Sequence, residues 1–267
     1  MADFVHLHTH SEYSLLDGLG KLDHLIERAR GFGMDALALT DHGAMYGAFK
    51  FYLKAKAAGI KPIIGVETYV AKRSRFDKEA RVDVDPYHLV LLAKNENGYK
   101  NLMKLVTYAH LEGYYYKPRI DWEILQKYHE DIICLSACIQ GQVPNLLRNN
   151  QDAEAEIVAR QYAELFGPDH YYIELQKHPH IPDIDIVNEK LVSLAKKLGL
   201  PLVATNDIHY VDPEDAEAQE ILLCVQTQHT IVQKNRQLTM IDSPDFYMRS
   251  PDEMRGLFIQ YPEAIEN

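Results

Sequence analysis

The chain has 267 residues, a hydrophobic fraction of 46% and a formal net charge of −11 at pH 7. This length suffices for one large α/β domain, or two small ones, with a sizeable apolar core. The acidic balance argues against a protein that grips nucleic acid through a broad basic face. It does not exclude a nuclease, because bound divalent cations would offset negative charge inside the site.

The N-terminus lacks the basic and apolar regions of a signal peptide, and no apolar run is long enough to span a membrane. The three cysteines, Cys134, Cys138 and Cys224, form neither a CxxC pair nor an even disulfide framework. We therefore expect a cytoplasmic protein with no membrane partner.

Short apolar runs alternate with amphipathic stretches, which indicates strands alternating with helices. In chain order, the pattern predicts strand Phe4–Leu7, helix Leu22–Arg30, strand Ala36–Leu39, helix Gly43–Ala58, strand Pro62–Val66, an exposed loop at Lys72–Asp85, strand Leu89–Leu92, helix Asn97–His110, strand Ile132–Leu135, helices through Gln151–Phe166, strand Tyr171–Leu175, helix Asp185–Leu198, strand Leu202–Ala204, and helices at Glu214–Val225 and Asp252–Ile259.

Seven strands separated by helices imply an α/β fold with a mainly parallel sheet and right-handed crossovers. No glycine-rich phosphate loop follows the first strand, which disfavours a dinucleotide-binding fold. A TIM-like barrel of βα units fits the length better. We predict one barrel domain over residues 1–245 and a C-terminal segment over residues 246–267.

Potential metal ligands recur where the predicted strands end, and these ends gather functional groups in such barrels. Behind the strands, in chain order, come His8, His10 and Asp17; Asp41 and His42; Glu67; Cys138; His178 and His180; and Asp207 and His209, while His88 lies at the start of its strand, a weaker fit. His6, His8 and His10 alternate, so in a strand their rings would share one face. Mixed imidazole and carboxylate ligands suit zinc, manganese or iron, and their number suggests several ions.

At this point the chain resembles a known family, the polymerase-and-histidinol-phosphatase (PHP) domain, in the form that begins bacterial DNA polymerase III alpha subunits. The resemblance rests on HLHTHSEYSLLDG, LALTDHGAMYGAFKFY, GIKPIIGVETYV, HLVLLAKNENGYKNLMKL, GYYYKPRID, LSACIQG, ATNDIHYV and the tail YMRSPDEMRGLFIQYPEAIEN. It implies a distorted seven-stranded (β/α)7 barrel and a C-terminal segment leading to a polymerase region absent here.

The resemblance also implies up to three divalent ions, with zinc or manganese favoured and iron or magnesium left open. One ion would be held by His8, His10, Glu67 and Asp207. A second would share Glu67 with His88 and Cys138, and a third would be held by Asp17, His42 and His209. His6, outside this set, is expected to be a supporting residue, and Asp41, beside His42, an orienting residue rather than a ligand.

The implied reaction is metal-dependent phosphodiester hydrolysis, as in a 3′–5′ proofreading exonuclease acting on a single-stranded or frayed DNA 3′ end. The catalytic candidates are Asp17, Asp207 and His209, and the implied partners are the rest of the alpha subunit and the replisome. Lys117, Arg119 and His178 are candidate substrate contacts, with a solvated loop or surface position as the alternative for each. Two rival hypotheses are a non-catalytic, partner-binding domain and a small-molecule phosphomonoesterase of the histidinol-phosphatase type.

Overall fold

A computed structural model describes residues 4–233, 236 and 239–267 of the chain. Its elements, in order, are α1 (Leu22–Gly31), β1 (Ala36–Leu39), α2 (Ala48–Ala57), β2 (Lys61–Val70), β3 (Tyr87–Ala93), α3 (Glu96–Leu111), β4 (Arg119–Ile120), α4 (Trp122–Tyr128), β5 (Ile132–Leu135), α5 (Gln142–Arg148), α6 (Asp152–Phe166), β6 (Tyr171–Gln176), α7 (Ile184–Leu198), β7 (Leu202–Thr205), the 3₁₀ turn η1 (Pro213–Asp215), α8 (Ala216–Thr227), α9 (Pro251–Leu257) and α10 (Pro262–Glu266).

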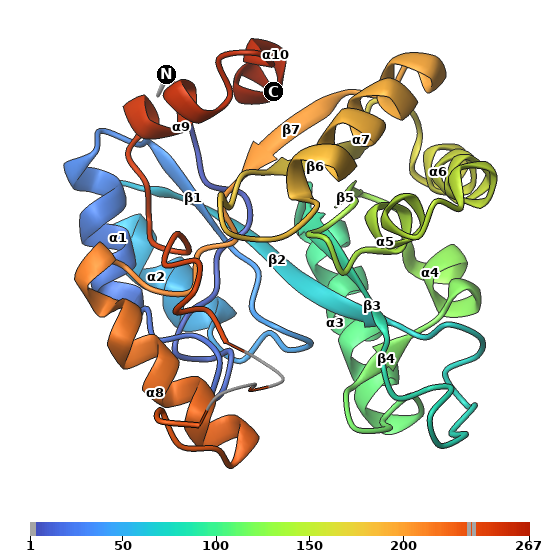
Figure 1. The fold of residues 1–267 in the computed structure, drawn as a ribbon, viewed down its shortest axis with the longest axis horizontal. Coiled ribbons are helices and arrows are strands. Elements are labelled where there is room, and N and C mark those ends of the chain that lie inside the picture. The colour runs from blue at the N-terminus through green and yellow to red at the C-terminus, as the bar shows by residue number, and fades with distance from the viewer. Residues whose placement is uncertain (1–3, 234–235, 237–238) are drawn as a thin grey trace.

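The strands form a curled seven-stranded sheet in the order β1-β2-β3-β5-β6-β7, with the short β4 paired to β2. Helices α1, α2 and α8 lie on one side of these strands and α3 to α6 on the other (Figure 1). The arrangement confirms the predicted α/β fold with a distorted seven-stranded barrel. Within the described ranges, no helix is both long and apolar enough to cross a bilayer.

The prediction of a first strand at Phe4–Leu7 is wrong, because these residues form no regular strand. This segment nevertheless lies between the two outer strands, because the Ala38 amide donates to the His6 carbonyl at 3.0 Å and the His10 amide donates to the Ile208 carbonyl at 2.7 Å. A single parallel bridge joins Thr9 to Ile208. The segment shares its backbone bonds between β1 and the residues after β7, so it closes the barrel without forming a ladder.

Strand β3 runs antiparallel to both of its neighbours, β2 and β5, whereas the other pairs are parallel. The sheet is therefore less uniformly parallel than predicted. Residues 71–86 contain no helix, so they form no βαβ crossover and lead the chain back along β2. As a consequence the start of β3, with His88, lies at the same edge of the sheet as the ends of its neighbours.

Helix α2 begins at Ala48, five residues later than the predicted start at Gly43. Gly43 has a left-handed φ of 57°, which a helix cannot continue, and its amide donates to the Glu67 carbonyl at 2.8 Å. The predicted loop at Lys72–Asp85 contains neither helix nor strand. The pattern missed β4 and α4 altogether.

Candidate metal centre

Glu67 lies at the centre of a buried cluster built from six separate segments of the chain. Strand β2 turns its carboxylate inward, where Oε1 lies 3.4 Å from His8 Nε2 and 2.9 Å from His88 Nδ1. The other oxygen, Oε2, lies 3.4 Å from His10 Nε2 and 2.7 Å from His42 Nδ1. One carboxylate therefore contacts four imidazoles, an arrangement suited to bridging metal ions.

Asp207 approaches the same cluster from the turn after β7. Its Oδ1 lies 3.2 Å from the Nε2 atoms of both His8 and His10. The backbone of Asp207 is left-handed, with φ of 48°, a conformation that aspartate tolerates better than most residues. This turn also brings His209 within 3.7 Å of the Asp207 carboxylate through its Nδ1 atom.

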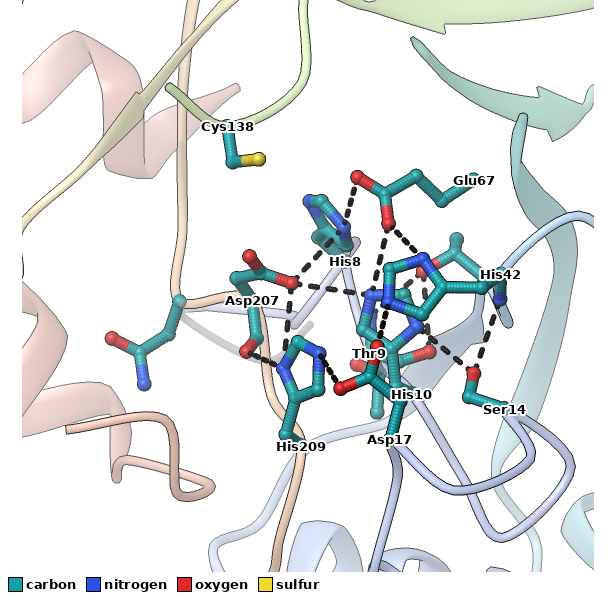
Figure 2. Close-up of polar contacts among 12 residues, drawn as sticks. His8, Thr9, His10, Ser14, Asp17, His42, Glu67, Cys138, Asp207 and His209 are labelled. Carbon is teal, nitrogen blue, oxygen red and sulfur yellow. Dashed lines mark hydrogen bonds and ion pairs between the residues drawn. The ribbon is translucent and has the colours of Figure 1, made fainter. Parts of the chain in front are cut away.

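Asp17, His42 and His209 form the outer part of the cluster. Asp17 Oδ2 lies 3.2 Å from His42 Nε2, and its Oδ1 lies 3.7 Å from His209 Nε2. Cys138 lies at the opposite edge, with its Sγ 3.8 Å from His88 Nδ1. Figure 2 shows the carboxylates and imidazoles gathered together and the Cys138 sulfur turned towards them.

Three groups of these side chains bring potential ligand atoms within 4.8 Å of one another: His8, His10 and Asp207; His42, Glu67 and His88; and His10, His42 and His209. Several buried ligand atoms in the cluster contact one another as ion pairs but make no hydrogen bond. They are His8 Nε2, His10 Nε2, Asp17 Oδ1, His42 Nδ1, Glu67 Oε2 and Asp207 Oδ1. Leaving such an atom unsatisfied costs about 1–3 kcal/mol, so the cluster fits divalent cations that would satisfy several atoms at once.

Neighbouring charges control the protonation of the cluster in the absence of an ion. Burial opposes the ionised form of Glu67, but His88, His42 and His8 outweigh it and hold the pKa of Glu67 well below its usual range. Burial likewise disfavours charged His42, but Glu67 and Asp17 raise its pKa to about 10. Burial, together with the nearby His42 and His209, lowers the pKa of His10 to about 3. An entering cation would therefore displace protons from some imidazoles but not from others.

A second layer of polar side chains orients the ligands. The Asp41 carboxylate accepts hydrogen bonds from the Ser11 amide at 2.7 Å and the Ser14 hydroxyl at 2.8 Å. Ser14 in turn lies 3.1 Å from His10 Nδ1. Asp41 thus orients His10 through Ser14, as expected of an orienting residue rather than a ligand.

Glu174, which our sequence reading missed, contacts His8 from β6. Its Oε1 lies 2.7 Å from His8 Nδ1 and also accepts hydrogen bonds from Gln176 and Thr205. This carboxylate fixes the ring so that Nε2 faces Glu67 and Asp207. The available signal was period two in YYIELQ, because Glu174 and Gln176 share the strand face that points into the barrel.

His6 and His178 are both buried histidines, with different surroundings. His6 Nε2 lies 2.8 Å from the Arg249 carbonyl oxygen, so its ring is held outside the cluster, as expected for a supporting residue. His178 stacks on Phe246 with ring centroids 4.1 Å apart, and Phe246 also meets the His209 ring edge-on at 5.7 Å. Both ring nitrogens of His178 lack partners, which corrects the alternative of a solvated surface position.

The prediction that Arg119 contacts DNA is wrong, because this residue is fully buried. Its guanidinium donates to the carbonyl oxygens of Gly113, Arg75, Asp83 and Asp77 at 2.8–3.1 Å. Lys117 is only partly buried, and its Nζ lies 5.2 Å from the centre of the Tyr69 ring. Lys117 therefore stays available to a ligand, whereas Arg119 holds together the loop that precedes β3.

An apolar cavity of about 830 Å³ lies at the opposite ends of the strands, lined by residues such as Leu7, Ile63, Leu135 and Val203. None of the ligand-capable side chains of the cluster lines it. The chemistry is therefore concentrated at the edge where β2 and β7 end and β3 begins.

Comparisons with known proteins agree with this geometry. The model of the PHP domain family matches residues 6–178. The chain is 50% identical over 265 residues to DNA polymerase III subunit alpha from Borreliella burgdorferi and to that from Treponema pallidum, covering 99% of this chain. It spans only 23% and 22% of the length of these two relatives.

A solved structure from Bifidobacterium adolescentis, described as a metal-dependent phosphoesterase, has a similar fold. The TM-score is 0.51 at 13% sequence identity, and the match covers 77% of this chain and 87% of the other. At this level of identity the similarity concerns the fold alone.

Proposed function

The chain belongs to the PHP domain family, and on that premise we propose that it is a metal-dependent 3′–5′ exonuclease domain of a DNA polymerase III alpha subunit. The observation that carries the proposal is the convergence of buried imidazoles and carboxylates with unsatisfied ligand atoms facing one another. The relatives that are 50% identical add the polymerase context. Residues 1–245 would form the hydrolytic barrel, and residues 246–267 would lead to the polymerase region, within a cytoplasmic replisome.

The proposed ligands form three groups, two of which share Glu67. His8, His10, Glu67 and Asp207 would hold one ion; Glu67, His88 and Cys138 a second; and Asp17, His42 and His209 a third. Zinc or manganese suits this mixture of nitrogen, oxygen and sulfur best, with iron or magnesium as alternatives. A bound divalent ion would supply a Lewis acid for the phosphoryl group and make water a stronger nucleophile at neutral pH.

Proton transfer would fall to three of these same ligands. Asp17, Asp207 and His209 are the candidates to accept or return a proton at a carboxylate oxygen or a ring nitrogen. His178, the other candidate substrate contact, is 1% exposed and stacks on Phe246, so we assign it to positioning Phe246 beside His209 rather than to direct contact with substrate. Burial lowers the pKa of His178 to about 4, so its neutral ring could donate one hydrogen bond and accept another.

The test follows the release of nucleotides from the 3′ end of a 5′-labelled single-stranded DNA. We expect cleavage with Zn²⁺ or Mn²⁺, and loss of cleavage with chelator or with Asp17→Asn. The matched control is Asp23→Asn on α1, an exposed carboxylate that pairs with Lys54, and it should keep full activity. Cleavage that survives both chelation and Asp17→Asn would sink the proposal.

Two other outcomes would favour the rival functions. Metal binding without any hydrolysis would indicate a structural, partner-binding domain. Turnover of a phosphomonoester such as histidinol phosphate faster than that of any DNA would indicate a small-molecule phosphatase.

A further inference from the structure

Exposed tyrosine rings from two loops, one between β1 and α2 and one before β4, lie near the metal cluster. We call Tyr46, Tyr114 and Tyr116, with Lys117, the aromatic rim. The three tyrosines are 59%, 54% and 69% exposed, so the core gains little from their rings. His110 links two of them, with ring centroids 6.3 Å from Tyr46 and 6.4 Å from Tyr114.

The aromatic rim is anchored directly to the cluster. His110 Nε2 lies 2.9 Å from the carbonyl oxygen of Gly43, the residue after His42. Tyr69 stacks on His42 with centroids 5.8 Å apart and carries Lys117 on its ring. Strand β4 pairs in parallel with the end of β2, Arg119 opposite Tyr69, which places the loop beside Glu67.

The backbone of this loop separates inward from outward side chains. Tyr115 packs inward, with the Arg119 guanidinium 5.4 Å from its ring centre. Tyr116 has a left-handed φ of 59°, and its ring meets Tyr115 at an interplanar angle of 70°. Buried Arg119 thus fixes the base of the loop, while Tyr114 and Tyr116 remain in solvent.

Exposed aromatic rings beside a cation suit unstacked bases joined by phosphates. Base–aromatic stacking needs no particular sequence and strengthens binding with each stacked base. The chain has a net charge of −11, so the rings would supply most of the affinity at this rim and Lys117 a single phosphate contact. A duplex hides the faces of its bases, so the aromatic rim favours a single strand.

We propose that the aromatic rim binds the bases of a single-stranded nucleic acid whose 3′ end lies at the metal cluster, with Lys117 on its phosphates. The direction of the strand rests on the proposed exonuclease function. The stacking itself does not, because it depends only on the rings and the lysine.

Binding is measured by fluorescence anisotropy of a dye-labelled oligothymidylate with the full chain in EDTA, so that no cleavage intervenes. We expect the double variant Tyr114→Ala/Tyr116→Ala to bind about tenfold more weakly or worse, and the Phe/Phe variant to bind within about twofold of the parent. Phe49→Ala, which removes an equally exposed ring at the opposite cavity, should change nothing. Equal binding by the alanine and parent proteins, or equal affinity for duplex and single strand, would overturn the proposal.

A second measurement isolates the lysine. Lys117→Gln should reduce the slope of log affinity against log salt by about 0.7, the value for one phosphate contact on a single strand. An unchanged slope would remove Lys117 from the proposal. Loss of binding to the rest of the polymerase, with DNA binding intact in the double alanine variant, would instead assign the rim to a protein partner. Failure of the nuclease test leaves these binding results standing, because EDTA removes hydrolysis from them.

Discussion

His6 and His8 lie two residues apart in one segment, yet they have different partners. The His8 ring is fixed by Glu174 on one nitrogen and faces Glu67 and Asp207 with the other. The His6 ring is bound to the Arg249 carbonyl and meets Phe4 edge-on at 4.8 Å. Strand periodicity alone would place both rings on one face, but the segment is irregular and separates them.

We expect His8→Gln to lose most of the bound metal and His6→Gln to retain it. The first change removes a nitrogen that faces two carboxylates, whereas the second costs about 1 kcal/mol of stability through one hydrogen bond. Metal content after dialysis, measured by plasma mass spectrometry, checks this ranking. Equal metal loss from both variants would show that His6 belongs to the centre.

His178 should make the free energy of unfolding depend on pH in the acid range. Its pKa is about 6.5 in the unfolded chain, and burial lowers it to about 4 in the fold. The unfolded chain therefore takes up a proton first, so the contribution is full above about pH 6.5 and is lost as the pH falls towards 4. The shift corresponds to roughly 3 kcal/mol.

Urea unfolding in EDTA at several pH values measures this effect. The parent should lose more stability between pH 7 and pH 4 than His178→Gln, and exposed His180→Gln should follow the parent curve. Parallel curves for the parent and His178→Gln would show that the ring titrates normally in the fold.

The sequence predicted the side chains that meet in the cluster because a barrel gathers the residues at the ends of its strands. It could not predict their detailed pairing, since the approach of Asp17 to His42 depends on successive turns between Ser11 and Gly18. Glu174 was not predicted as a site residue, because the sequence around a carboxylate in an apolar strand does not indicate that it contacts His8. Arg119 was misassigned because loop composition does not reveal burial.

At the scale of elements, apolar runs located most strands well, and β5 matches its predicted bounds, Ile132–Leu135. An apolar run does not indicate the direction of its strand relative to the neighbouring strands, so the antiparallel orientation of β3 could not be predicted. Strand β4 has two residues and exists only through its pairing with the end of β2. Local patterns cannot indicate an element whose stability comes entirely from residues distant in the chain.

The loop between β2 and β3 depends on Arg119 for its order. The guanidinium bonds to its carbonyl oxygens from β4, and Arg75 adds ion pairs with Asp121 at 3.1 Å and Glu112 at 2.7 Å. We expect Arg119→Met to lower the free energy of unfolding by about 3–5 kcal/mol, because it leaves several buried carbonyls unpaired. Lys117→Met, two residues away, should change it by less than about 1 kcal/mol.

Limited trypsin digestion separates a local effect from a global one. The variant Arg119→Met should be cut early within residues 72–85, which contain several lysines and arginines, while Lys117→Met is cut at the parent rate. Equal protection of this loop in both variants would show that Arg119 is dispensable for its order.

At the scale of the whole molecule, the metal centre joins parts of the chain that are distant in sequence. Its side chains come from the N-terminal segment, the residues after β1, strand β2, the start of β3, the residues after β5 and the turn after β7. The N-terminal segment has no ladder of its own. Ions bound there would tie this segment to both sides of the barrel. Metal binding should therefore stabilise the entire fold and not just the site.

We expect Zn²⁺ or Mn²⁺ at a thousandfold excess over its Kd to stabilise the chain by about 4 kcal/mol. This corresponds to a rise in Tm of roughly 10 °C relative to the chelated protein. Glu67→Gln should largely abolish the rise, because it replaces the carboxylate that contacts four imidazoles. Asp23→Asn, far from the cluster on α1, should retain it. Calorimetry at fixed metal concentration measures the Tm of all three proteins. A metal-induced rise in the Tm of Glu67→Gln as large as that of the parent would contradict the central role of Glu67.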